Sequence, residues 1–444
     1  MRRSVALSRY LQRHIETGLP DCPGAAEQWR HVLVIPAYRE APELREKLVC
    51  LPPGRGRTLV ILVLNRPDSD PDREANRALR GALRHLPPSG NCAGSADGPL
   101  VKALNRHTDL YCHDMEQLRG PSPKAQGVGL ARKTGFDIAL KWMDEDGIRG
   151  DWICSTDADA QLPGDYFLRL QDAAGVATCF PFWHVPGPDP RCNRATALYE
   201  LRLHHYVLGL EYAGSPCAWH SLGSCLAVRA RAYAQVRGFP RRAGGEDFYL
   251  LNKVAKVGAV VTSGGRCIAL QSRDSSRVPF GTGPAVAKIG AAGDPLALPL
   301  FYQPACFEGL RGVLGALPQM WRAPETMLPA LLAARRLDRP LQQACCSVLE
   351  TLGFAQFLAH ARRQGSTQDQ FLRQFHQWFD AFRTLKFIHG LRAAGWEDQP
   401  LAVLRQPEPP FWPATMEAAA TPEGLCQAFR DHRGWVTGCD QPGW

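Results

Sequence analysis

The chain has 444 residues, of which 45% are hydrophobic and 21% charged, and its formal net charge is +9. This composition excludes a chain dominated by disorder and predicts one large globular domain with an appendage, or two to three domains. The basic residues are scattered, which fits an anionic cofactor or loose attraction to anionic lipid and disfavours a nucleic-acid partner.

The sequence gives little indication of a signal peptide, a membrane span or a metal site built from cysteines. Charged residues at the amino terminus have no apolar core after them, and no run reaches the about 20 apolar residues of a membrane span. The fifteen cysteines include no Cys-x-x-Cys pair, and most lie in apolar stretches as small buried residues. We therefore expect a cytoplasmic protein with at most peripheral membrane contact.

The first half of the chain alternates between strand and helix patterns. Residues 1–30 predict a helix and a turn, and the apolar runs 31–36 and 58–65 predict parallel strands with a helix over 41–50 between them. Residues 86–126 are rich in Pro, Gly and Ser, which predicts a long insertion that acts as a mobile flap. The pattern is typical of an α/β fold.

The middle of the chain continues this alternation. A helix is expected over 127–143, followed by an apolar strand that ends near residue 155. Further strands are expected within 176–184 and 258–271, and a helix over 194–210. The predicted organisation is an amino-terminal helical segment (1–30), an α/β domain (31–290) and a mainly helical carboxy-terminal region (291–444).

The carboxy-terminal region shows strong helical patterns over 341–361 and 367–391. Thr367 and Gln370 have the spacing of a capping box at the start of the second helix. Its aromatic residues either line a lipid or acceptor groove or face the protein's own core; they are Phe371, Phe375, Trp378, Phe379 and Phe382. The last 45 residues are expected to form an irregular covering segment.

Asp157 and Asp159 follow the strand that ends near residue 155. Residues i and i+2 of an extended backbone project to the same side, so both carboxylates can converge on one divalent cation. Hard oxygen ligands suit Mg²⁺ or Mn²⁺, which commonly hold a diphosphate. The alternative is a plain turn at the end of a strand.

Basic side chains lie at two further places where an anion is expected. Arg132 and Lys133 fall in the first turns of a helix that begins with two glycines, where free N–H groups favour an anion; the alternative is a solvated helix surface. Arg273 and Arg277 stand before a Gly-Thr-Gly turn and form either a phosphate clamp in a closing loop or a charged surface loop. His220 is either an acceptor contact or third metal ligand, or a structural histidine.

Four segments in this order resemble a bacterial family 2 glycosyltransferase with the nucleotide-sugar-binding GT-A fold. They are Val34-Ile35-Pro36-Ala37-Tyr38-Arg39-Glu40, the helix start at 127–135, Ser155-Thr156-Asp157-Ala158-Asp159, and Gly244-Gly245-Glu246-Asp247-Phe248. The segment 223–229 before Gly238-Phe239 adds to the likeness, which covers roughly residues 30–285.

The resemblance implies that the loop after the first strand cradles the nucleoside, with contacts from Pro36, Ala37, Tyr38 and Glu40. Such enzymes often place an aspartate after the second strand to bind the base, whereas this chain has Asn65. An amide can donate to and accept from a uracil edge, so Asn65 is a candidate base contact; the alternative is a turn residue before Pro67.

The resemblance also assigns roles to the acidic residues. Asp159 is the metal ligand, and Asp157 meets the ribose or the metal through water. Asp247 is the catalytic base, assisted by Glu246, because an acceptor hydroxyl is a weak nucleophile that must lose its proton as it attacks. Alternatively, Glu246 and Asp247 only stabilise the amino end of a helix.

The sequence thus predicts an inverting, metal-dependent hexosyltransferase that uses a nucleotide-diphosphate sugar, with uridine as the expected base. The acceptor hydroxyl belongs to a saccharide, a lipid-linked molecule or a small molecule. Three alternatives stay open: a retaining glycosyltransferase of glucosylglycerate type, a sugar nucleotidyltransferase, and a non-catalytic nucleotide-sugar-binding protein. The nucleotidyltransferase normally has a glycine-rich loop with a basic residue after the first strand, which Pro36-Ala37-Tyr38-Arg39 lacks.

Overall fold

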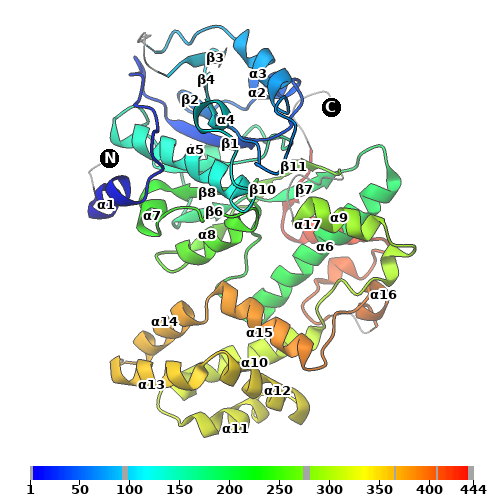
Figure 1. The fold of residues 1–444 in the computed structure, drawn as a ribbon. Helices are drawn as coiled ribbons and strands as arrows, with labels where there is room; N and C mark the ends of the chain where they lie inside the picture. The colour runs from blue at the N-terminus through cyan, green and yellow to red at the C-terminus, as the bar shows by residue number, and fades with distance from the viewer. Residues whose placement is uncertain (1–3, 93–98, 274–280, 365–366, 407–408, 439–444) are drawn as a thin grey trace. The chain divides into compact units, whose positions relative to one another are not determined.

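The computed structural model describes residues 4–92, 99–273, 281–364, 367–406 and 409–438 (Figure 1). The chain divides into two compact units. The first contains Met1–Asn193, Ser221–Ala287 and Arg433–Trp444, and the second contains Arg194–His220 and Lys288–His432. The first unit combines strands and helices, and the second is helical.

An eight-stranded sheet in the order β3-β4-β2-β1-β5-β8-β6-β9 forms the centre of the first unit. Strands β4, β2, β1 and β5 run parallel, and β8 runs antiparallel between β5 and β6. The predicted α/β class is confirmed. The eight strands are β1 (His31–Ala37), β2 (Thr58–Leu64), β3 (Val101–Asn105), β4 (Thr108–Asp114), β5 (Trp152–Ser155), β6 (Ala177–Cys179), β8 (Leu226–Arg229) and β9 (Val260–Thr262).

The two predicted apolar runs form the centre of this sheet. All seven residues of β1 and of β2 are buried, and they pair in register from His31 opposite Thr58 to Ala37 opposite Leu64. Two smaller pairs complete the first unit: β7 (Phe182–Val185) with β11 (Ile268–Gln271), and β10 (Gly265–Arg266) with β12 (Trp435–Val436). Because β1 and β2 are parallel and aligned, the loops that follow them start at the same edge.

Helix α5 (Gly127–Asp144) packs on β1, β2 and β5. A Cβ atom at Gly135 would lie 2.3 Å from Val34 Cγ1, so this glycine lets the helix approach the sheet closely. The other helices within the first unit are α1 (Val5–Arg13), α2 (Leu44–Val49), α3 (Arg77–Arg84), α4 (Met115–Arg119), α7 (Ala230–Gln235) and α8 (Glu246–Val254).

Within residues 86–126, for which the sequence predicted a long insertion acting as a mobile flap, residues 93–98 lie outside the described part of the chain, and much of the rest belongs to the sheet. Strands β3 and β4 in this range join the sheet, and β4 pairs with β2 along its whole length. The sequence of β4 looks polar because it contains Asp109, which is fully buried and accepts hydrogen bonds from Trp29 Nε1 at 2.8 Å and Arg57 Nη2 at 2.9 Å. Partners distant in sequence therefore allow a buried charged residue in a strand that has neighbours on both sides.

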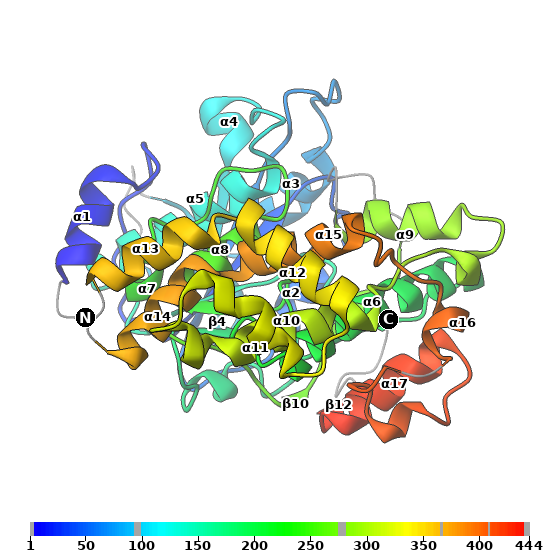
Figure 2. The ribbon, with the colours of Figure 1, turned by 90° about the horizontal axis from the view of Figure 1, so that it is seen from below.

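The second unit consists of helices that pack on one another (Figure 2). Helix α10 contacts α11, α12, α14 and α15, and α13 packs against α14. These helices are α10 (Pro304–Met320), α11 (Leu328–Ala333), α12 (Arg339–Thr351), α13 (Phe354–Gln364), α14 (Gln368–Trp378), α15 (Ala381–Ala393), α16 (Leu401–Leu404) and α17 (Pro422–His432). Helices α6 (Pro190–Tyr212) and α9 (Thr282–Gly290) contain residues of both units.

Each of the two long helices predicted in this region is two helices. The first is interrupted at Gly353, which has a φ of +87°, and the second at Asp380, whose side chain caps α15 by accepting from Arg383 N at 3.0 Å. A left-handed residue and a helix cap both end a helix even where the apolar spacing continues. The predicted cap at Thr367 is confirmed, since its Oγ1 accepts from Gln370 N at 3.2 Å.

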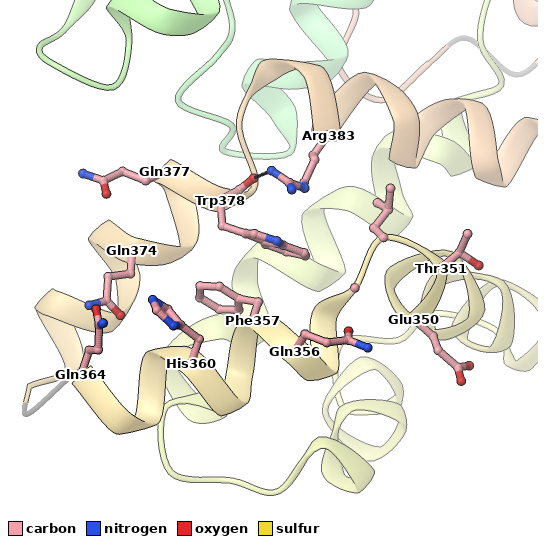
Figure 3. A pocket seen from close by; sticks show the side chains of 12 residues that line it. Glu350, Thr351, Gln356, Phe357, His360, Gln364, Gln374, Gln377, Trp378 and Arg383 are labelled. Carbon is pink, nitrogen blue, oxygen red and sulfur yellow. Dashed lines mark hydrogen bonds between the residues drawn. The ribbon is translucent and has the colours of Figure 1, made fainter.

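Three of the five aromatic residues singled out in the sequence face the core of this unit. Phe371, Phe375 and Phe379 are at most 2% exposed. Trp378 is partly exposed and stacks on Phe357 with ring centroids 4.8 Å apart, in a groove of about 770 Å³ (Figure 3). Core packing therefore explains the regular spacing of these aromatic residues, and Trp378 is the one that lines the groove.

The last part of the chain is more regular than predicted, because it contains the eleven-residue helix α17 and the short strand β12. Leu425 and Phe429 are fully buried and lie four residues apart on α17. Among the described residues, no helix is both long enough and apolar enough to cross a membrane.

Candidate active site

Segments that follow three neighbouring strands of the first unit meet at one edge of the sheet. Asn65 N donates to Ala37 O at 3.1 Å, and Thr156 N donates to Val34 O at 3.1 Å. These contacts hold the loops after β2 and β5 beside the end of β1. Ligands of α/β sheets bind at this carboxyl edge.

Arg132 on α5 ties together acidic residues from two other elements. Its side chain is 4% exposed, its Nη1 lies 3.0 Å from Glu246 Oε1 at the start of α8, and its Nη2 donates to Asp157 after β5. Gly223 packs against it, since a Cβ there would lie 2.5 Å from the guanidinium carbon. Ser155 Oγ donates to Gly223 O at 2.8 Å and fixes that loop. The structure thus joins three of the predicted segments in one cluster.

Asp159 belongs to a neighbouring ion-pair group. Arg273 Nη2 lies 2.6 Å from Asp159 Oδ2 and 3.9 Å from Glu40 Oε1. Burial lowers the pKa of Lys47, and Asp159 and Glu40 oppose that shift. Arg277, the second arginine of the predicted clamp, lies outside the described residues.

The loop after β1 is held by residues that the sequence did not single out as site residues. Asp70 accepts from Tyr38 Oη at 2.5 Å and from Arg39 Nε at 2.9 Å. Asn76 Oδ1 accepts from Arg39 N at 3.0 Å, and Asn76 Nδ2 donates to Asn65 O at 3.0 Å. Asn76 therefore links the loops after β1 and β2. Polar residues in a loop give no sequence signal for such a contact.

The other predicted nucleoside contacts differ in exposure. Pro36 and Ala37 are the last two residues of β1 and are buried, so they lie in the strand and not in the loop that follows it. Asn65 is 5% exposed. Tyr38 is partly exposed, and burial and its hydrogen bond to Asp70 raise the pKa of its hydroxyl to about 12.

Glu246 and Asp247 begin α8, as the sequence predicted for an acidic helix start. Gly245 precedes them with a φ of +67°, a left-handed conformation that glycine adopts without strain. Glu246 is 3% exposed, whereas Asp247 is partly exposed and accepts from Phe248 N at 2.7 Å and from the N–H of Gly223. Asp247 is thus the more accessible of the two carboxylates and is oriented by backbone donors.

Both carboxyl groups have raised pKa values. Burial raises the pKa of Glu246 to about 7, with Arg132 opposing the shift and Asp247 adding to it. Burial also raises the pKa of Asp247, and the positive charge of Arg132 again opposes this shift. Because the two groups repel each other when both are ionised, they lose their protons as a coupled pair.

This coupling predicts a pH dependence of activity. A carboxylate that must accept a proton works only when ionised, and a raised pKa keeps it protonated to higher pH, so turnover should rise with pH toward neutrality. Glu246→Gln removes the neighbouring negative charge, so the rise should move to lower pH. Turnover measured across pH at saturating substrates checks this, and an unmoved or upward-moved limb would contradict the coupling.

Lys133, next to Arg132, belongs to a different network. Its Nζ lies 2.7 Å from Asp137 Oδ2, 2.7 Å from Tyr10 Oη and 2.8 Å from His14 O. Asp137 is fully buried, and Tyr10 comes from α1. The ammonium group therefore anchors the amino-terminal segment to α5, which favours a structural role over a donor contact.

Lys133→Met is expected to lower the free energy of unfolding by about 3–5 kcal/mol, because it leaves the buried Asp137 without its cation. Lys141→Met is the matched control on the same helix, where the partners Asp21 and Glu145 are 89% and 32% exposed, and should cost at most about 1 kcal/mol. Chemical denaturation measures both. If Lys133→Met left stability unchanged and weakened donor binding, the result would support the donor contact that the sequence suggested and contradict the structural role.

His220 is part of the second unit. Its Nε2 lies 3.0 Å from His204 Nδ1, and both rings are buried. This contact is consistent with the structural alternative.

The acidic residues have the chemistry of a divalent cation site. The side chains of Asp157 and Asp159 are 40% and 21% exposed, and Glu40 lies near Asp159 through their shared partner Arg273. Carboxylate oxygens are the ligands that Mg²⁺ and Mn²⁺ prefer. Each aspartate already has an arginine partner, so a cation has to share these carboxylates with Arg132 and Arg273.

No protein-family model matches the chain, and no curated protein matches it. Solved structures similar to it include residues 1–349 of S. aureus TarS in complex with UDP, at 11% identity and a TM-score of 0.33 over 80% of this chain and 91% of that one. Another is the mannosyltransferase PcManGT from Pyrobaculum calidifontis with GDP-Man and Mn²⁺, at 17% identity and a TM-score of 0.35 over 84% and 94%. At these scores the likeness carries no functional argument.

Proposed function

We propose that the protein is an inverting glycosyltransferase that moves a hexose from a uridine-diphosphate donor to an acceptor hydroxyl with the help of a divalent cation. The observation that supports this most is the bridge from Arg132 to Asp157 and Glu246. It puts the strand-end acids and the helix-start acids in one partly exposed cluster at the carboxyl edge of a mainly parallel sheet.

The nucleoside is proposed to lie on the loop after β1. Tyr38 offers a ring and Glu40 a carboxylate, while Asn65 at the end of β2 offers an amide for the base. The bonds from Asp70 and Asn76 hold this loop in one conformation, so little order has to be gained on binding. Pro36 and Ala37 contribute through the strand end that supports the loop.

The diphosphate is proposed to lie between Arg132 and Arg273. Asp159, with Asp157, would hold Mn²⁺ or Mg²⁺, which when bound offsets the charge that develops on the departing nucleoside diphosphate. Both arginines now neutralise these aspartates. A bound diphosphate brings negative charge of its own, so each guanidinium can serve a phosphate oxygen as well as its carboxylate.

Asp247 is proposed to act on the acceptor. Its carboxylate takes the proton of the acceptor hydroxyl while the oxygen forms a bond to the anomeric carbon, and the bond from that carbon to the diphosphate oxygen breaks with its electron pair. Attack opposite the leaving group inverts the anomeric configuration. Glu246 positions Arg132 and, through its charge, tunes the base.

A thermal-shift screen of uridine and guanosine diphosphate sugars, with and without Mn²⁺, tests the proposal. A true donor at about 100 times its Kd should stabilise the fold by about 2.7 kcal/mol, and only together with Mn²⁺. Stabilisation by a nucleoside triphosphate and a sugar phosphate, with no effect of any nucleotide sugar, would instead indicate a nucleotidyltransferase. A product with retained anomeric configuration in NMR would favour the retaining alternative.

A further inference from the structure

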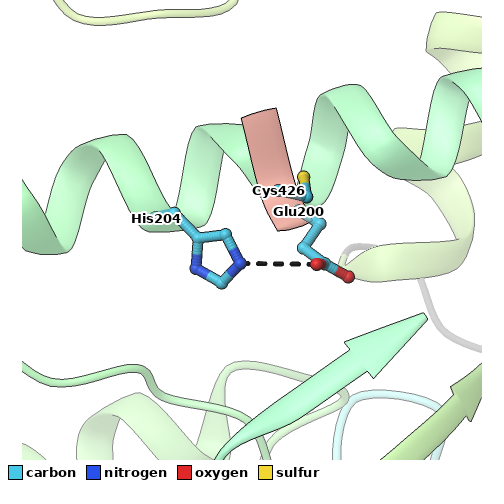
Figure 4. A group of neighbouring side chains, drawn as sticks. All are labelled: Glu200, His204 and Cys426. Atoms are coloured by element: carbon cyan, nitrogen blue, oxygen red, sulfur yellow. Dashed lines mark hydrogen bonds and ion pairs between the residues drawn. The ribbon is translucent and has the colours of Figure 1, made fainter. Parts of the chain in front are cut away.

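Three buried side chains with metal-ligating atoms meet in the second unit. Glu200 and His204 lie one turn apart on α6, and Cys426 lies on α17 (Figure 4). One carboxylate oxygen, one ring nitrogen and the sulfur all lie within 4.8 Å of one another. Each of the three residues is at most 2% exposed.

The spacing of the first two ligands fits both a long hydrogen bond and a pair of metal ligands. His204 Nε2 lies 3.4 Å from Glu200 Oε1, beyond the about 2.7–3.2 Å of a good N–H···O bond. Nitrogen and oxygen atoms bound at about 2.0–2.1 Å to a tetrahedral zinc ion lie about 3.4 Å apart. The pair on α6 therefore already has the separation of two zinc ligands.

The ring of His204 is held in the orientation that ligation requires. Its other nitrogen, Nδ1, lies 3.0 Å from His220 Nε2, and its ring stacks on Phe429 with centroids 3.8 Å apart. Metal-binding histidines nearly always hydrogen-bond through the nitrogen that faces away from the metal, which fixes the tautomer. His220 fills that position.

The group contains a carboxylate, a guanidinium and a thiol that can ionise. Arg430 forms an ion pair with Glu200, and the Cys426 thiol donates to Ala197 O at 3.3 Å. Without a metal, Arg430 balances the carboxylate and the thiol keeps its proton. A metal ion replaces that proton, and the thiolate and the carboxylate then offset two of the three positive charges of the metal and Arg430. Arg430 Nη1 donates to Glu200 Oε1, the oxygen that faces His204, so a metal shares this carboxylate with Arg430.

We propose that Glu200, His204 and Cys426 supply three of the ligands of a zinc ion that joins α6 to α17, with His220 as the orienting partner of His204. The mixed oxygen, nitrogen and sulfur set suits zinc, whereas Mg²⁺ and Mn²⁺ prefer oxygen ligands. The site consists of residues of the second unit alone and does not depend on the proposed function.

Metal analysis of the full chain, purified without chelators and supplied with Zn²⁺, tests the proposal first. We expect about one equivalent of zinc per chain after gel filtration and a lower Tm after chelation that is restored by Zn²⁺ but not by Mg²⁺. Background zinc in a folded sample, together with a Tm that chelation does not change, would overturn the proposal.

Cobalt substitution then identifies the ligands. The Co²⁺-loaded protein should show a thiolate-to-cobalt charge-transfer band, which is lost in Cys426→Ser and kept in Cys345→Ser, a control at another buried cysteine of the same unit. Glu200→Gln keeps the shape of the side chain and should lower zinc affinity at least about tenfold, even if Cys426→Ser fails to fold. A band that persists in Cys426→Ser would place the metal elsewhere and overturn the assignment.

Asp159→Asn separates this site from the acidic cluster of the first unit. This variant should keep its zinc and its cobalt band, since Asp159 belongs to neither α6 nor α17. Loss of the zinc in Asp159→Asn would show that the measured metal belongs to the acidic cluster, and would overturn the zinc site while leaving the glycosyltransferase proposal standing.

Discussion

Asp247→Asn is expected to lower turnover by about 10²–10⁴-fold, the usual cost of losing a general base, and to leave donor affinity nearly unchanged. The carboxylate is proposed to address the acceptor hydroxyl and not the diphosphate. An amide keeps the shape and can still accept the N–H bonds from Phe248 and Gly223 that orient the side chain. Calorimetry of donor binding and release of the nucleoside diphosphate measure the two quantities separately.

Asp369→Asn is the matched control, because Asp369 is the second residue of α14 just as Asp247 is the second residue of α8. An acid at this place stabilises the helix by about 0.3–1 kcal/mol through the helix dipole. The control should show only this small loss of stability. If Asp247→Asn behaved in the same way and turned over normally, the acids of α8 would be helix-stabilising residues and no base.

Asp159→Asn is expected to abolish the Mn²⁺ dependence of donor binding and to lower turnover by more than about 100-fold. The substitution keeps the size of the side chain but removes the charge that Arg273 now balances at 2.6 Å. Metal stabilisation of a leaving diphosphate amounts to several kcal/mol, and each 1.36 kcal/mol corresponds to about tenfold in rate. Donor titrations with and without Mn²⁺ provide the measurement.

Asp165→Asn serves as the control for charge removal in the same segment. Asp165 follows β5 as Asp159 does and pairs with Arg169 Nη2 at 2.6 Å, so it too is an acid with an arginine partner. Its substitution should leave turnover and the Mn²⁺ response unchanged. Wild-type kinetics in Asp159→Asn, with the same response to Mn²⁺, would show that the metal is bound elsewhere.

Local patterns predicted the elements that carry the candidate site. The apolar runs of β1 and β2 are buried on both faces of a parallel sheet, and such strands must be continuously apolar. The strand end before Asp157 and the helix start at Glu246 were also readable, because each depends on a few neighbouring residues.

Only the tertiary structure showed that Arg132 and Lys133 have different roles. Neighbouring residues of a helix point about 100° apart, so one faces the acids at the sheet edge and the other faces α1. The rotation of α5 decides which is which, and packing on the sheet sets that rotation.

Contacts between distant segments account for what the sequence did not show. The sequence alone determined the α/β class, most of the helices and strands, and the acidic pairs. The hydrophobic period and the ends of strands and helices are local properties of the sequence. It did not reveal β4, whose buried Asp109 depends on Arg57 and Trp29, or the meeting of Glu200 with Cys426. Such groups become stable in the core only when folding brings their partners to them.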